Sequence, residues 1–145
     1  MIQLFNVAKT FGPSIALHEI NLTIRKGEFV FISGPSGAGK TTLLRLMFGA
    51  LVPTTGQILI NRINLNRISN TNLDLLRRRM GFIFQDFKLL HRRTVAQNVA
   101  IALEVTGERP SEIRKRTRQA LRAVGLEKKE QAYPCLLYTS DAADE

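Results

Sequence analysis

Cysteine is almost absent from this sequence of 145 residues, in which Cys135 is the only one. A single cysteine excludes an internal disulfide and offers no cysteine-based metal cluster. The sequence also lacks any run of about 18 uninterrupted apolar residues, so it contains no candidate membrane span. Its first residues lack the basic head and the long apolar stretch of a secretory signal. We therefore expect a protein that stays in the cytosol.

Acidic residues are few relative to basic ones, with 12 Asp and Glu against 21 Lys and Arg and a formal net charge of +9. The excess is concentrated between Arg109 and Lys129, where eight basic residues face only Glu112 and Glu127. Such a stretch suits an acidic partner, either nucleic acid or an anionic membrane surface. No aromatic residues are interleaved among these charges, as single-strand binders require, so we expect a solvated face beside a membrane and not a nucleic-acid site.

Three segments have the pattern of strands. Residues 20–24 alternate between apolar and polar side chains, which predicts an antiparallel strand with one buried face. Residues 29–32 and 81–84 are continuous apolar runs, which are typical of central parallel strands covered on both faces. Ile58 and Ile60 indicate a further short strand after a turn at residues 53–56.

Four segments have the spacing of helices. The first begins at Thr41, has helical spacing of its apolar residues and can end at Gly49. Its apolar residues are Leu43, Leu44, Met47, Phe48 and Leu51. A short helix is expected over residues 73–79. Thr94 and Gln97 have the spacing of a capping box, which opens a helix that reaches about residue 106. Its inward face is expected to hold Val95, Val99, Ala102 and Leu103. The last helix is expected to be capped by Ser111, with Ile113, Ala120, Leu121 and Val124 inward.

The segment between the run at 29–32 and the first helix matches the pattern G-x-x-x-x-G-K-[ST], a phosphate-binding loop. Glycines let successive backbone N–H groups face one anion, and the following helix adds the positive end of its dipole. Lys40 is expected to reach the β and γ phosphates, and the Thr41 hydroxyl to hold Mg²⁺. The expected phosphate-binding residues are Gly34, Pro35, Ser36, Gly37, Ala38, Gly39, Lys40, Thr41 and Thr42.

This loop alone does not name a reaction, because kinases, GTPases and transport ATPases share it. Residues 34–40 also resemble the loop of guanylate kinases. In that family the loop lies near the start of the chain, whereas here more than thirty residues precede it. Those residues predict a strand-rich layer that a small kinase lacks.

The stretch from Leu4 to Gly49 resembles the opening of the ATP-binding cassette (ABC) ATPases, with Phe11 at the position of the aromatic residue that stacks on adenine. The alternative for this side chain is ordinary packing. The stretch MGFIFQDFKLL resembles the Q-loop of the same family, with Gln85 as its glutamine. The resemblance implies that Gln85 touches Mg²⁺ and positions the attacking water, and that residues 86–90 meet a membrane partner.

Within that family, residues 84–107 are similar to the FtsE group of cell-division ATPases. The resemblance implies an α/β fold, ATP and Mg²⁺ as ligands, and a homodimer in the full-length form. It also implies a peripheral position at the cytoplasmic face of the membrane and an integral membrane partner of the FtsX type. ATPases of lipoprotein release or of small-solute uptake remain alternatives, as does, more distantly, a DNA-repair ABC ATPase.

The resemblance ends at residue 134. The family pattern calls next for a Leu-Ser-Gly-Gly signature, yet no glycine follows Gly125. The acidic end of the next core strand and the later switch histidine are missing as well. We therefore expect residues 1–134 to be the N-terminal part of an ABC ATPase domain, namely an antiparallel layer, a P-loop core and the start of a helical subdomain. Residues 135–145 are expected to be a non-native tail, and the chain alone to be inactive and poorly soluble or partly disordered.

Overall fold

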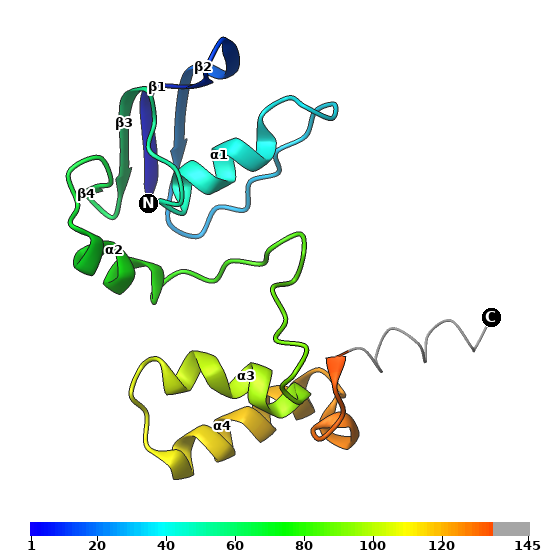
Figure 1. Ribbon diagram of the computed structural model, residues 1–145. Coiled ribbons are helices and arrows are strands. Elements are labelled where there is room, and N and C mark those ends of the chain that lie inside the picture. The colour runs from blue at the N-terminus through cyan, green and yellow to red at the C-terminus, as the bar shows by residue number, and fades with distance from the viewer. Residues whose placement is uncertain (135–145) are drawn as a thin grey trace. The chain divides into compact units, whose positions relative to one another are not determined.

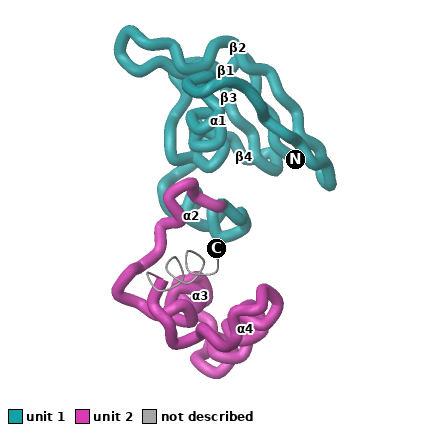
Figure 2. Tube along the Cα trace, turned by 90° about the vertical axis from the view of Figure 1, so that its right-hand side faces the viewer, with its two compact units in different colours: residues 1–82 teal, residues 83–145 magenta. Residues whose placement is uncertain are grey.

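The computed structural model describes residues 1–134. The chain divides into two compact units, which are Met1–Phe82 (unit 1) and Ile83–Glu145 (unit 2) (Figure 2). Cys135 and the predicted non-native tail lie outside the described residues. No helix within residues 1–134 has both the length and the apolar character needed to cross a bilayer.

Unit 1 is built on a four-stranded sheet in the order β2–β1–β3–β4, in which every neighbouring pair is antiparallel (Figure 1). Its strands are β1 (Ile2–Phe11), β2 (Ser14–Ile24), β3 (Thr55–Ile60) and β4 (Ile63–Asn64). The antiparallel strand predicted at residues 20–24 is confirmed as the end of β2, and the strand predicted around Ile58 is confirmed as β3.

An irregularity in the β1–β2 ladder is fixed by a pair of asparagines. Asn6 and Glu19 both have positive φ, at 47° and 48°. The Asn6 N–H donates to Asn21 Oδ1 at 2.9 Å, and Asn21 Nδ2 donates to Asn6 Oδ1 at 2.9 Å. On the other side of β1, a Cβ on Gly56 would lie 2.3 Å from the Asn6 carbonyl oxygen. Only glycine therefore lets β3 approach β1 at this bulge.

Helix α1 (Lys40–Met47) completes the core of unit 1. Leu43 and Met47 are buried as predicted, but Leu44 is 43% exposed and Leu46 is fully buried in its place. The buried positions 43, 46 and 47 follow i, i+3, i+4 spacing, whereas Leu44 is turned about 100° away from Leu43. The core consists of Leu4, Val7, Leu17, Leu43, Leu46, Met47, Ile58, Ile60 and Leu76.

Helix α2 (Asn70–Arg77) holds the end of α1. It begins at Asn70, three positions before the predicted start at Leu73, because Ser69 caps it by accepting from the Asn72 N–H. Arg77 Nη2 donates to the Gly49 carbonyl at 2.9 Å and Nε to the Phe48 carbonyl at 3.3 Å. The guanidinium therefore satisfies carbonyl groups just beyond the C-terminus of α1.

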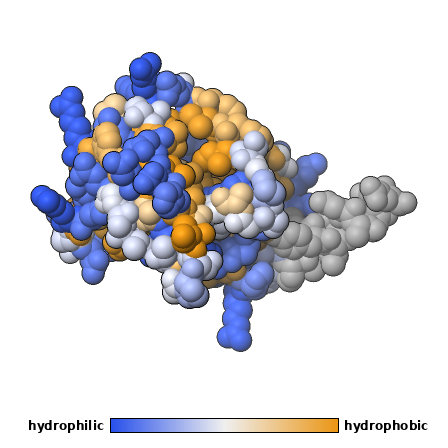
Figure 3. Space-filling model, turned by 90° about the horizontal axis from the view of Figure 1, so that it is seen from above, coloured by the Kyte–Doolittle hydropathy of each residue, from blue (hydrophilic) through white to orange (hydrophobic). Residues whose placement is uncertain are grey.

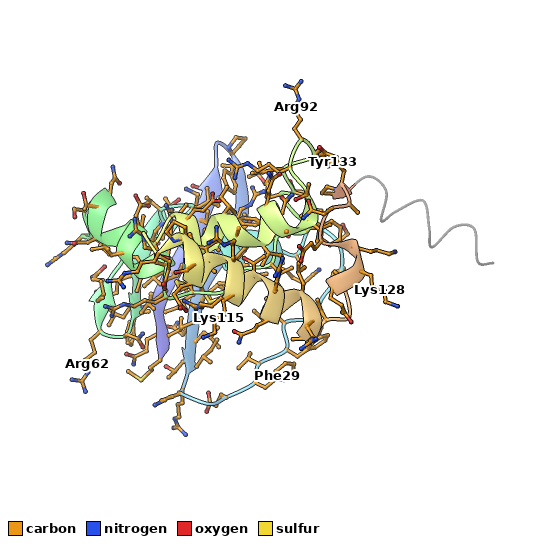
Figure 4. The ribbon with its side chains drawn as sticks, turned by 90° about the horizontal axis from the view of Figure 1, so that it is seen from below. Phe29, Arg62, Arg92, Lys115, Lys128 and Tyr133 are labelled. Carbon is orange, nitrogen blue, oxygen red and sulfur yellow. The ribbon has the colours of Figure 1, made fainter. Side chains whose placement is uncertain are left out.

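The two central strands predicted from continuous apolar runs are wrong. Residues 29–32 and 81–84 belong to no strand. Phe29 is 93% exposed, Phe31 82% and Ile83 91%. A strand requires pairing with a neighbouring strand, and among residues 1–134 neither run belongs to the sheet β2–β1–β3–β4. Figure 4 shows Phe29 on the connection between β2 and α1, and Figure 3 shows apolar side chains exposed together on one face.

Unit 2 contains α3 (Val95–Glu104), α4 (Pro110–Ala123) and the 3₁₀ turn η1 (Glu127–Lys129). Helices α3 and α4 lie side by side (Figure 1). The predicted capping box is confirmed, because the Thr94 N–H donates to Gln97 Oε1 at 2.9 Å and the Gln97 N–H donates to Thr94 Oγ1 at 3.3 Å. Of the predicted inward face of α3, Val95 is buried and Val99 and Leu103 are partly buried, whereas Ala102 is exposed.

The ends of α4 differ from the prediction. Arg109, not Ser111, is the N-cap residue, because Pro110 takes the first helical position, where its missing N–H costs nothing. Leu121 is buried as predicted, whereas Val124 is 67% exposed. Val124 lies past the last helical residue, and Gly125 turns the chain with φ at 72°. Ala120 also lies on the exposed side.

Candidate functional site

Residues 34–39 form the glycine-rich loop that leads into α1. Gly34, Gly37 and Gly39 have φ of 151°, 81° and 85°. Residues that carry a Cβ rarely adopt these φ values, so the backbone conformation of the loop requires glycine at these three positions. A bond from the Ala38 N–H to the Pro35 carbonyl at 3.3 Å closes the turn.

Gly39 has a second role that the sequence pattern did not reveal. A Cβ at this position would lie 2.4 Å from the Ala16 carbonyl oxygen and 2.8 Å from Leu17 Cδ2. The last residue of the loop is therefore pressed against β2. This contact fixes where α1 begins relative to the sheet, and it joins residues more than twenty positions apart.

The N-terminal turn of α1 is open to an anion. Gly39 occupies the N-cap position without a side-chain hydrogen bond, and no acidic residue lies in the first turn. The first N–H groups of any helix lack partners inside the helix and carry the positive end of its dipole. These donors, together with the loop backbone, form the arrangement that binds phosphate groups in proteins.

Lys40 closes this loop with its own side chain. Its Nζ donates to the carbonyl oxygens of Gly34 and Pro35, both at 2.7 Å. The ammonium group is thus held beside the loop backbone, where an incoming phosphate oxygen would replace the carbonyls as acceptor. Thr41, the next residue, lies in the first turn of α1 and is exposed.

Phe11 lies at the end of β1, where it pairs with Ser14 across the hairpin to β2. Its side chain is 48% exposed, and Lys9 Nζ lies 5.2 Å from the ring centroid. A half-exposed ring is not part of the core, which disfavours ordinary packing as its purpose. From this hairpin β2 runs directly to Ala16, the residue whose carbonyl lies against Gly39.

Gln85 lies in unit 2, in the turn after residues 81–84, and its side chain is exposed. Phe87 and Lys88 in the same turn have positive φ, at 53° and 51°, which is uncommon for residues other than glycine. Thr41 belongs to unit 1, so a magnesium ion shared by Thr41 and Gln85 stays a prediction. A hydroxyl, an amide and phosphate oxygens are the hard donors that Mg²⁺ prefers. Within residues 1–134 no group of three His, Cys, Asp or Glu side chains forms an alternative metal site.

Asn98 anchors the segment that follows Gln85, and sequence reasoning missed it. Its Oδ1 accepts from the Leu90 N–H at 2.8 Å, while its Nδ2 lies 3.1 Å from the Leu90 carbonyl. The same Nδ2 also lies within 3.1 Å of the carbonyls of Arg93 and Thr94. The only available signal was an amide residue one turn after a capping box.

Comparison with known proteins gives one consistent family. Residues 17–137 match the family model described as ABC transporter. The cell division ATP-binding protein FtsE of Bacillus subtilis (strain 168) is 46% identical over 135 residues, which are 92% of this chain and 59% of that protein. FtsE of Mycobacterium tuberculosis is 43% identical, with the same shares covered. The methionine import ATP-binding protein MetN of Rhizobium johnstonii is 43% identical over 94% of this chain and 38% of its own length.

Solved structures agree. A dimeric, post-hydrolysis state of the ATP-binding cassette MJ0796 bound to ADP and Pi matches with a TM-score of 0.83 and 36% identity, covering 92% of this chain and 62% of that one. A second dimeric structure of MJ0796, a bacterial ABC transporter cassette, matches with a TM-score of 0.85. This chain spans about three fifths of the length of the FtsE proteins it matches. Because the family model matches residues 17–137, the chain belongs to the ABC transporter family.

Proposed function

We propose that this chain supplies the ATP-binding half of the active site in a complete cassette, which hydrolyses ATP and couples it to a membrane partner. The observation that carries the proposal is the loop at residues 34–39, with three glycines at positive φ and an uncapped helix N-terminus behind it. Its ammonium group, on Lys40, is already held beside the loop backbone. This combination suits a polyphosphate better than any other common ligand.

Each predicted site residue then has a defined task. The backbone of residues 34–42 donates hydrogen bonds to the phosphates, and Lys40 exchanges its two carbonyl acceptors for phosphate oxygens. The Thr41 hydroxyl and the Gln85 amide would each be able to hold Mg²⁺, which would neutralise phosphate charge. Gln85 also orients the attacking water, while Phe11 stacks on adenine. Lys40 and Gln85 are therefore the catalytic residues that this chain contributes.

We further propose a role in cell division, with an integral membrane subunit of the FtsX type as partner. FtsE proteins at 46% and 43% identity support this choice, although a MetN protein reaches 43%. The contact is expected near residues 86–90, where Phe87 is 62% and Leu90 41% exposed. The complete protein would act as a homodimer at the cytoplasmic face of the membrane, and MJ0796 was solved as a dimer. The second candidate is an uptake or lipoprotein-release ATPase.

Lys40→Ala in the complete protein tests the nucleotide assignment. We expect loss of ATP binding, measured with a fluorescent ATP analogue, and loss of phosphate release. Lys26→Ala is the matched control, because Lys26 is an exposed lysine outside the loop. Binding and turnover that survive Lys40→Ala unchanged would remove the basis of the proposal. For the 145-residue chain alone we expect weak binding and negligible turnover, since positioning dominates phosphoryl transfer.

A second experiment separates the two cellular roles. Affinity purification of the complete protein from membranes is expected to recover one integral membrane protein, without ATP-driven uptake of a solute in vesicles. ATP-dependent accumulation of methionine or another small solute would instead favour the uptake ATPase.

A further inference from the structure

Unit 1 contains an open cavity of about 580 Å³ beside β4, the segment after it and α2, and most of the residues that line it are exposed. None of its lining residues belongs to the loop at 34–42, so the cavity is separate from the nucleotide site. Its volume lies within the range of about 300–1,000 Å³ found for small-molecule sites. The apolar part of its wall is formed by Ile63, Ile68, Leu75 and Leu76.

Two arginines, Arg67 and Arg79, give this cavity a positive charge. No acidic residue lines it, and Asp74, the only acid of α2, forms an ion pair with Arg77 at 3.2 Å. Among residues 1–134 the structure gives the side chains of Arg67 and Arg79 neither an ion pair nor a hydrogen bond. Both arginines are exposed, so water solvates their guanidinium groups in the free protein and both are accessible to an anion.

Neutral hydrogen-bonding groups lie in the same wall. Ser69 and Asn72 line the cavity at the start of α2. The Ser69 hydroxyl oxygen accepts from the Asn72 N–H at 3.4 Å, which leaves its own hydrogen and the Asn72 side-chain amide able to donate. A carboxylate or phosphate oxygen accepts such bonds together with those of arginine.

We propose that this cavity binds a small organic anion with an aliphatic body. Arg67 and Arg79 hold a carboxylate or phosphate head, and the aliphatic body covers Ile63, Ile68 and Leu75. A neutral aliphatic molecule would leave both cations without a partner, and an inorganic anion would leave the apolar wall in water. The ligand class thus follows from the two halves of the wall taken together.

The bound anion would contact the helix that also holds the end of α1. Asn72, Leu75 and Leu76 of α2 line the cavity. Leu73 and Arg77 of the same helix lie against Gly49: a Cβ on Gly49 would be 2.7 Å from Leu73 Cδ1, and Arg77 donates to the Gly49 carbonyl. The two groups of residues occupy different faces of one eight-residue helix. The proposal requires no nucleotide, because no lining residue belongs to the phosphate loop.

The probe is sodium octanoate, titrated into the ¹⁵N-labelled complete protein and followed by amide chemical shifts. We expect saturable shifts at Asn64, Ser69 and Asn72. The neutral isostere 1-octanol and inorganic phosphate are each expected to bind at least tenfold more weakly. Octyl phosphate in place of octanoate then shows whether the site prefers a phosphate or a carboxylate head. Equal affinity for octanol and octanoate, or shifts confined to other residues, would overturn the proposal.

Variants test the two cations. Arg67→Gln and Arg79→Gln together are expected to weaken octanoate binding at least tenfold, whereas Arg78→Gln, an exposed arginine that does not line the cavity, leaves it unchanged. If the double variant loses helical circular dichroism, Arg67→Lys with Arg79→Lys keeps the charges and is expected to retain most of the affinity. Undiminished binding by a folded glutamine double variant refutes the proposal. Lys40→Ala is expected to leave octanoate binding intact, so this result is independent of the nucleotide assignment.

Discussion

Gly39→Ala is the sharpest test of how the phosphate loop is attached to the sheet. The residue has φ at 85°, and a Cβ would lie 2.4 Å from the Ala16 carbonyl oxygen. An alanine in the left-handed region costs about 1–2 kcal/mol. Relieving the overlap with the backbone of β2 adds about 1–3 kcal/mol, as overpacking does in cores. We therefore expect the free energy of unfolding of unit 1 to fall by about 2–5 kcal/mol.

Gly37→Ala is the matched control. Gly37 has φ at 81° but no atom within 4 Å of an added Cβ, so only the conformational cost applies. The sequence contains no tryptophan, so unfolding in urea is best followed by circular dichroism at 222 nm. A midpoint that falls clearly further for Gly39→Ala than for Gly37→Ala supports the packing against β2. Equal losses for the two variants would refute the reasoning, because the contact with Ala16 would then cost nothing.

Three further predictions concern stability. Arg62→Gly is expected to raise the free energy of unfolding by about 0.5–1 kcal/mol, and with it the urea midpoint, because Arg62 has φ at 69° in the turn of the β3–β4 hairpin and its side chain projects outward (Figure 4). A lower midpoint would contradict this. Asn98→Ala is expected to lower the free energy of unfolding of unit 2 by about 1–3 kcal/mol and to speed hydrogen exchange at the Leu90 amide. Unchanged exchange at that amide would show that the hydrogen bond from Leu90 to Asn98 is dispensable. Arg77→Gln is expected to lower the melting temperature through loss of the bonds to the Phe48 and Gly49 carbonyls, with Arg78→Gln as the neutral comparison.

Local patterns in the sequence predicted local structure well. The capping box at Thr94 and the inward position of Leu121 depend on neighbours within one or two turns, so spacing alone identifies them. The helix starts predicted at Ser111 and Leu73 were displaced by local neighbours as well. Pro110 takes the first position of α4, and Ser69 caps α2.

Structure that depends on distant partners was not predictable in the same way. An apolar run such as residues 29–32 states a preference for burial but does not state which strand will pair with it. The loop at 34–41 was found from its glycines, yet the contact of Gly39 with β2 required knowledge of the fold. The roles of Phe11, Thr41 and Gln85 stay predictions, because they depend on a bound nucleotide.

Because Lys40 Nζ donates to the Gly34 and Pro35 carbonyls, these two oxygen atoms compete with a bound anion for the ammonium group. The ammonium group has three N–H donors, so an arriving anion accepts from the third or replaces one of the two carbonyl oxygens. A monovalent anion such as chloride or acetate binds the ammonium group only slightly better than the carbonyl oxygens do, whereas the clustered charges of a triphosphate bind it much more strongly. The resting geometry therefore favours ligands that carry several clustered negative charges over small monovalent anions.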